Sequence, residues 1–64
     1  MTTQLDRERL RAAVRDLPGQ STRELAEALG MSKRSAFSDL SRLEREGLVE
    51  RWWKDAVTRW FPTL

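Results

Sequence analysis

Apolar residues recur at helical spacing in three segments of the chain and crowd into two short segments near its end. In the first segment, Leu10, Ala13, Val14 and Leu17 follow the i, i+3, i+4, i+7 pattern of an amphipathic helix. Pro18 disfavours helical geometry in the residue before it, and a glycine follows as a loop residue. The pattern predicts a helix over residues 3–17, whose opposite face is a mixture of acids and arginines.

A second, shorter helix is predicted over residues 22–29 from its end signals. Ser21 and Glu24 have the spacing of a capping box, in which each residue bonds to the backbone N–H of the other. Gly30 stands just past the last helical residue, where a left-handed conformation is wanted. The residues expected on one apolar side are Leu25, Ala28 and Leu29, with Ala26 small enough to allow a close neighbour.

A third helix is predicted over residues 33–46, between a Ser32 cap and Gly47. One residue separates Gly30 from Ser32, so the second and third helices must cross steeply, as in a helix-turn-helix. At about 100° per residue, the buried stripe is Ala36, Leu40 and Leu43. The opposite face carries Arg34, Ser38, Ser41 and Arg45, flanked by Ser35, Phe37 and Arg42. Arginines beside short hydroxyl side chains suit a surface that touches the edges of bases.

After the third helix the composition favours β-structure. Residues 48–53 and 57–61 are rich in Val, Trp and Phe, with a polar break between them, and Pro62 ends the second segment. We predict a β-hairpin. Its register stays open, because the turn contains neither glycine nor asparagine and a one-residue shift exchanges the faces of Trp52 and Trp53.

The composition excludes several kinds of site. The 64 residues predict a single domain over 1–64, with no cysteine or histidine to form disulfides, a thiolate or imidazole metal site, or a general base. No catalytic residues and no cofactor are expected. The chain has neither a membrane-spanning apolar run nor a signal peptide, which predicts a cytoplasmic protein. The net charge is +2 and the pI about 9.9, which is compatible with a nucleic-acid partner.

The order of helix, helix, turn, helix and hairpin is that of a winged helix-turn-helix, an α+β and mainly helical fold. The segment ELAEALGMSKRSAFSDLSRLEREGLVER, residues 24–51, closely resembles the DNA-binding core of bacterial transcription regulators of the MarR and ArsR kind. In that core a recognition helix ends in leucine, charged residues and a glycine before the first strand of the wing. The resemblance implies a small prokaryotic or phage transcription regulator, such as a repressor, that binds double-stranded DNA.

The resemblance also implies which residues meet the DNA. The start of the recognition helix would enter the major groove, its exposed side would contact bases, and the beginning of the second helix and the hairpin would contact phosphates or the minor groove. The expected DNA-binding residues are Thr22, Arg23, Lys33, Arg34, Ser35, Phe37, Ser38, Ser41, Arg42, Arg51, Lys54 and Arg59. Phe37 has an alternative role, which is to complete the core between the second and third helices.

The sequence departs from these regulators in three respects. Asp39 stands where they usually carry an apolar residue, and it would repel phosphates if it faced outward. The long helices by which MarR-type regulators form dimers and enclose an effector are absent from this sequence. The lack of His and Cys excludes an ArsR-type metal site. A DNA-binding module without a small-molecule effector is therefore expected.

Three tryptophans in the hairpin exceed what a small wing needs for its own packing. One of them, Trp60 or Trp53, is expected to anchor the hairpin on the first helix. Trp52, Trp53 and Trp60 are the candidates for a partner or homodimer contact, since an exposed aromatic patch usually marks such a surface. The main alternative function is therefore a winged helix that binds another protein through the hairpin. RNA binding is a third possibility, and enzymatic activity is not expected.

Overall fold

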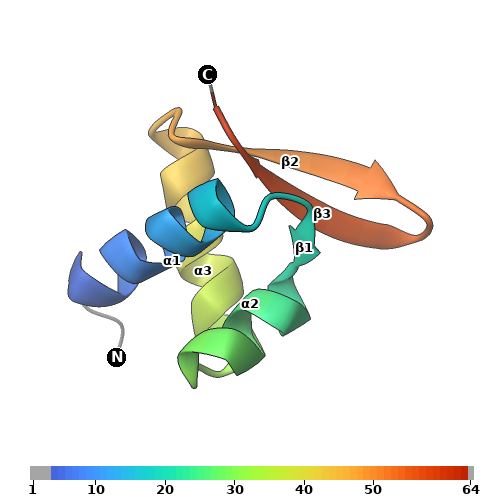
Figure 1. Cartoon of the computed structure of the whole chain (residues 1–64). Helices are drawn as coiled ribbons and strands as arrows, with labels where there is room; N and C mark the ends of the chain where they lie inside the picture. Colours follow the sequence, from blue (N-terminus) through green and yellow to red (C-terminus); the bar gives the residue numbers. More distant parts are fainter. Residues whose placement is uncertain (1–3, 64) are drawn as a thin grey trace.

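The computed structural model describes residues 4–63 and shows a winged helix-turn-helix, as predicted (Figure 1). Three helices form the body of the molecule, and a long hairpin projects beyond them. The elements are α1 (Gln4–Asp16), β1 (Gln20–Ser21), α2 (Thr22–Leu29), α3 (Lys33–Arg45), β2 (Val49–Lys54) and β3 (Val57–Pro62). The predicted mainly helical α+β class is confirmed.

The ends of the helices follow from the local signals in the sequence. The Ser21 hydroxyl accepts the Glu24 backbone N–H at 3.1 Å, and the Glu24 carboxylate accepts the Ser21 N–H at 2.9 Å. This reciprocal pair is the predicted capping box. Gly30 closes α2 in the left-handed region at φ 66°, and Ser32 caps α3 by accepting the Ser35 N–H at 3.1 Å. The steep turn between α2 and α3 is thereby fixed.

Helix α1 differs from its prediction at its C-terminal end. The predicted start, Thr3, lies outside the described residues. The helix ends at Asp16 rather than Leu17, and the side chain of Leu17 is 53% exposed. The expectation that Leu17 completes the apolar stripe of α1 is therefore wrong. Leu17 already belongs to the turn before Pro18, where the chain leaves the helix axis and passes toward β1.

A short strand that the sequence did not predict adds to the sheet. Strand β1 pairs antiparallel with β3, with Gln20 opposite Trp60 and Ser21 opposite Arg59, so that the strand order is β1-β3-β2. Two residues are too few to show the alternation that identifies a strand. The pairing joins the chain just before α2 to the hairpin.

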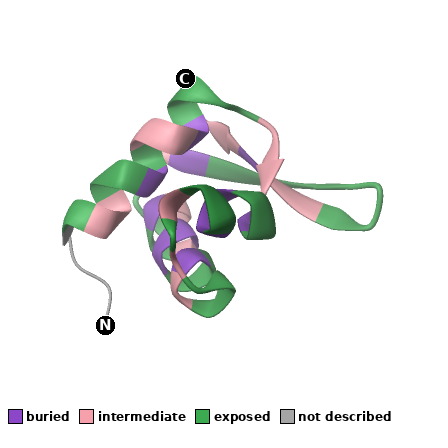
Figure 2. Ribbon diagram, turned by 60° about the horizontal axis from the view of Figure 1, so that its bottom comes forward, coloured by how far each residue is buried: buried purple, intermediate pink, exposed green. Residues whose placement is uncertain are grey.

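The core lies where the three helices meet the base of the hairpin, and the far end of the hairpin is exposed (Figure 2). Its fully buried large side chains are Trp60, Leu10, Leu25, Leu40 and Val14. Trp60 is thus the tryptophan that anchors the hairpin. Ala28, predicted to face inward, is exposed and Ala26 is buried instead, because the small residues of α2 occupy more than one side of this short helix.

The structure settles the register of the hairpin. Trp52 lies opposite Arg59, and Trp53 lies opposite Thr58, on either side of a two-residue turn. Both turn residues, Asp55 and Ala56, have positive φ angles of 54° and 61°, which is the geometry of a type I′ turn. Because neighbouring residues of a strand face opposite sides, the two adjacent tryptophans lie on different faces of the wing.

Candidate nucleic-acid interface

The outer face of α3 forms one open groove. It is lined by Arg34, Phe37, Ser38, Ser41, Arg42 and Arg45. The helical period places these residues opposite the buried stripe of Ala36, Leu40 and Leu43, as predicted. The groove therefore presents guanidinium donors and small hydroxyl groups along a single helix face.

The cations of α3 have no acidic partners among residues 4–63. No carboxylate of the described chain lies within ion-pair distance of Lys33, Arg34, Arg42 or Arg45. By contrast, Arg15 pairs with Asp16 and Arg23 pairs with Glu27, each at 3.1 Å. The positive charge left without a nearby carboxylate is thus concentrated on the third helix.

The acids at and near α3 are turned away from this face. Asp39 is buried and does not face outward, and its Oδ2 has no hydrogen-bond partner among the described residues. The Glu44 carboxylate accepts a hydrogen bond from Arg51 at 2.9 Å. Glu46 lies 4.0 Å from Arg7 of α1. The outer face of α3 is therefore cationic without an opposing carboxylate.

Arg51 is held within the molecule. Its Nη2 donates to the hydroxyl of Ser41 at 3.2 Å as well as to Glu44, and its guanidinium lies over two aromatic rings. The guanidinium carbon is 5.2 Å from the ring centre of Phe37 and 5.0 Å from that of Trp60. Phe37 packs edge-on against Trp60, with 6.2 Å between ring centres. Arg51 thus connects the wing to the recognition helix.

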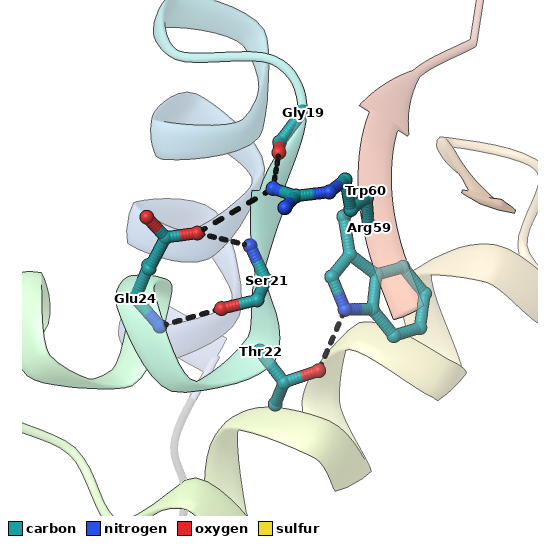
Figure 3. Close-up of polar contacts among 6 residues, drawn as sticks. All are labelled: Gly19, Ser21, Thr22, Glu24, Arg59 and Trp60. Carbon is teal, nitrogen blue, oxygen red and sulfur yellow. Dashed lines mark hydrogen bonds and ion pairs between the residues drawn. The ribbon is translucent and has the colours of Figure 1, made fainter. Parts of the chain in front are cut away.

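The beginning of α2 is joined to β3 by polar contacts (Figure 3). The indole N–H of Trp60 donates to the hydroxyl of Thr22 at 2.8 Å, and both residues are buried. Arg59 donates to the Gly19 carbonyl at 2.9 Å and lies 3.8 Å from the Glu24 carboxylate. Thr22 and Arg59, expected at phosphates, therefore both have partners inside the chain.

The same cluster shifts the acidity of Glu24. The Ser21 backbone N–H is the largest cause, followed by the Ser21 hydroxyl, and together they hold the pKa of Glu24 below its ordinary value. Desolvation opposes the shift, and the charge of Arg59 adds a smaller lowering. The ionised form of Glu24 is thus the one that the cap stabilises.

An apolar concavity separates the wing from the start of the recognition helix. Phe37 and Trp53 line it from opposite sides and are 42% and 73% exposed. The remaining lining residues are Ser21, Thr22, Arg23, Lys33, Ala56, Val57 and Thr58. Lys54 lies at the end of β2, beside the turn. The sequence identified Trp53 as a partner contact or as an anchor of the hairpin on the first helix. Its place beside α3 depends on the register, which no local signal fixed.

Solved structures with similar folds include three that are described next. The transcriptional regulator SlyA shares 23% identity at a TM-score of 0.81, over 95% of this chain and 44% of that protein. The PcaV regulator of Streptomyces coelicolor shares 26% identity at 0.78, over 97% and 45%. FabT of Streptococcus pneumoniae, solved in complex with DNA, shares 17% identity at 0.81, over 97% and 45%. The chain spans less than half the length of each of these proteins.

The predicted resemblance to MarR-type regulators is confirmed by the likeness to the transcriptional regulators SlyA and PcaV. Among proteins of curated function, no match to this sequence was found. Within residues 4–63, no helix is both long and apolar enough to cross a bilayer, and no three side chains that could bind a metal ion lie together.

A family profile described as winged helix-turn-helix DNA-binding matches residues 12–50, which is more than half of the sequence. The chain therefore belongs to the winged helix-turn-helix DNA-binding family.

Proposed function

We propose that this protein binds double-stranded DNA in a sequence-specific manner and regulates transcription, with α3 inserted in the major groove. The observation that carries the proposal is the charge of α3, whose four cations have no acidic partner among the described residues. Three of them, Arg34, Arg42 and Arg45, line the outer face, and the acids are turned away from it. A solvated helix of a folded domain more often intersperses both signs of charge along its exposed face. A row of cations without carboxylates matches the charge of a phosphate backbone.

The contacts divide by chemistry. Arg34 and Arg42 have the planar donors that bind guanine O6 and N7, and Ser38 can bond to any base edge. Lys33 and Ser35, in the first turn of α3, suit phosphates, which fix the orientation of the helix on the duplex. Lys54, at the tip of the wing, can reach the neighbouring backbone. Arg51 donates a hydrogen bond to the hydroxyl of Ser41. Each of these two residues therefore positions the other on this surface.

The size of the module favours two copies on one operator. A single module of this kind covers only about 600 to 1,000 Å² on DNA, and regulators gain affinity and specificity by binding two half-sites. We therefore include a homodimer in the proposal. A small prokaryotic or phage repressor, acting in the cytoplasm without a cofactor or an effector, is the simplest protein of this description.

The test is fluorescence anisotropy of labelled duplex DNA at two salt concentrations. Binding should weaken steeply as salt rises, because each neutralised phosphate releases counterions. The variant Arg34→Ala, Arg42→Ala should lose most of this affinity. The control variant Arg11→Ala, Arg15→Ala removes the same amount of charge from α1 and should retain the affinity for DNA. Equal losses in both variants would show that binding depends on net charge and not on the face of α3.

A specific observation favours the second candidate, a module that binds another protein. Trp52 and Trp53 are 59% and 73% exposed, on opposite faces of the wing. Large exposed aromatic side chains are enriched at protein contacts. This candidate predicts binding that tolerates salt and is abolished by Trp52→Ala or Trp53→Ala, whereas DNA binding through α3 is salt-sensitive.

A further inference from the structure

Strand β2 forms an open edge of the sheet. The strand order β1-β3-β2 gives it one neighbour, and no described residue pairs with its other side. Every residue of β2 after Val49 is exposed. A free strand edge presents unpaired N–H and C=O groups and is commonly blocked by proline, a bulge or charged side chains. The charges on β2 are of both signs, Glu50 against Arg51 and Lys54, so a second strand of the same sequence can complement them. Residues 49–54 contain no proline and pair with β3 in an unbroken register.

The turn fixes which backbone groups point outward. In a two-residue hairpin the residues beside the turn, Lys54 and Val57, form a hydrogen-bonded pair, so the even residues of β2 bond to β3. The Thr63 N–H donates to the Leu48 carbonyl at 3.3 Å, which continues this pattern. The N–H and C=O groups of Val49, Arg51 and Trp53 therefore point to the free edge.

We propose that β2 pairs antiparallel with β2 of a second copy of this chain, about a two-fold axis at Trp52. In this register Arg51 of each copy lies opposite Trp53 of the other. Both residues have outward backbone groups, so each pair exchanges two hydrogen bonds. Glu50 lies opposite Lys54 of the second copy, and the two Trp52 side chains meet at the axis.

Each pair in this register is chemically complementary. Glu50 and Lys54 form an ion pair on each side of the axis, on the same face as the two Trp52 rings. On the other face, Arg51 meets Trp53 of the second copy in a cation–π contact. Arg51 already lies over the rings of Phe37 and Trp60, so the new indole would extend an existing stack.

Other registers fit less well. A shift by one residue would pair odd residues of one copy with even residues of the other. The outward N–H and C=O groups of the odd residues would then face even residues, whose backbone groups already bond to β3. Centring the axis on Arg51 would oppose two arginines, which repel. Centring it on Trp53 would engage only residues 52–54 as paired strand and leave Glu50 beyond the strand pairing. The Trp52-centred register engages residues 50–54 of both copies, and it explains why this edge carries both signs of charge.

The first test is sedimentation without DNA, so its outcome is independent of the proposed DNA binding. The wild-type chain should form a dimer. Glu50→Lys and Lys54→Glu should each weaken the dimer about tenfold or more, since each variant replaces two attractions with two repulsions. Combining both substitutions should restore the wild-type association. A monomeric wild type, or a dimer indifferent to both single substitutions, would overturn the proposal.

The second test uses the absence of cysteine from the sequence. Directly opposed residues of a non-hydrogen-bonded pair have Cα atoms about 4.5 Å apart, within reach of a disulfide. Under mild oxidation Trp52→Cys should therefore form a covalent dimer. In Glu50→Cys the two new thiols lie about 13 Å apart along the strands, so this variant should stay monomeric in denaturing gels. Equal cross-linking of both variants would refute the register.

Discussion

Trp60 donates its indole hydrogen to Thr22 at 2.8 Å, and this bond joins the middle of β3 to the first residue of α2. Both partners are buried, so water cannot replace either of them. The bond lies next to the pairing of β1 with β3, and the side chain of Trp60 fills the core between the helices. A single residue of the wing thereby sets the position of the helix-turn-helix.

Replacing Thr22 with valine should lower the free energy of unfolding by about 1 to 3 kcal/mol. Valine keeps the shape of threonine but leaves the buried indole N–H without an acceptor. Urea unfolding followed by circular dichroism measures the loss. The control Thr22→Ser retains the hydroxyl and should cost less, about 1 kcal/mol, for one buried methyl group. A smaller loss in the valine variant than in the serine variant would refute this role for the hydroxyl.

Glu24→Gln should reduce the dependence of stability on pH in acid. The pKa of Glu24 is lower in the folded chain than its ordinary value, chiefly through the Ser21 backbone N–H. The folded state therefore gains stability above the ordinary value of about 4.3, and this gain disappears as the pH falls through the lowered pKa. In the variant, this part of the acid destabilisation should be missing.

Thermal unfolding between neutral pH and the acid range measures the effect. The difference between the wild-type chain and Glu24→Gln should shrink steadily as the pH falls below the ordinary glutamate range. Glu8→Gln removes the same charge from α1 and is the matched control. If the two variants differ from the wild type by the same amount at every pH, the cap does not favour the ionised carboxylate.

Local signals in the sequence were enough to predict the helices and most of the core. Ser21 and Glu24 specify their cap within four residues, and Gly30 specifies the end of α2, because these interactions involve neighbours in the chain. The stripe of Ala36, Leu40 and Leu43 needed only the helical period. The anchoring role of an indole followed from the size of its apolar surface.

Contacts between residues on different strands could not be predicted from local sequence signals. The partners of Arg51 and Arg59 depend on which residues face each other in the hairpin, and the turn residues Asp55 and Ala56 gave no signal of their register. Both arginines were therefore predicted to bind DNA, although each is bonded within the chain. Thr22 was likewise assigned to phosphates, because nothing near it in the sequence shows that β3 will bring Trp60 to its hydroxyl.

Ala56→Gly should raise the free energy of unfolding. Ala56 has a φ of 61°, a left-handed conformation that costs a residue with a Cβ about 1 to 2 kcal/mol. Glycine adopts it freely but loses more entropy on folding, so a net gain of about 0.5 to 1 kcal/mol is expected. Thermal unfolding measures it. The same substitution at Ala28, which is exposed on α2, should instead cost about 1 kcal/mol.

Arg51→Met should weaken DNA binding through the position of the recognition helix rather than through a lost phosphate contact. The substitution retains an unbranched side chain but removes the bonds to Ser41 and Glu44. We expect a loss of about 0.5 to 1 kcal/mol in stability, because the pair is partly exposed and its cation–π contacts are modest.

The salt dependence of binding separates the two mechanisms. A residue that neutralises a phosphate contributes about 0.9 to the slope of log affinity against log salt concentration. Arg51→Met should therefore lower the affinity for DNA at each salt concentration and leave the slope unchanged. By contrast, Arg42→Ala or Arg34→Ala removes a side chain of the α3 groove and should change the affinity for DNA or the sequence specificity. Lys33→Met, in the first turn of α3, is the matched control and should reduce the slope if Lys33 meets a phosphate. A reduced slope in Arg51→Met would mean that Arg51 leaves Glu44 to bind DNA directly.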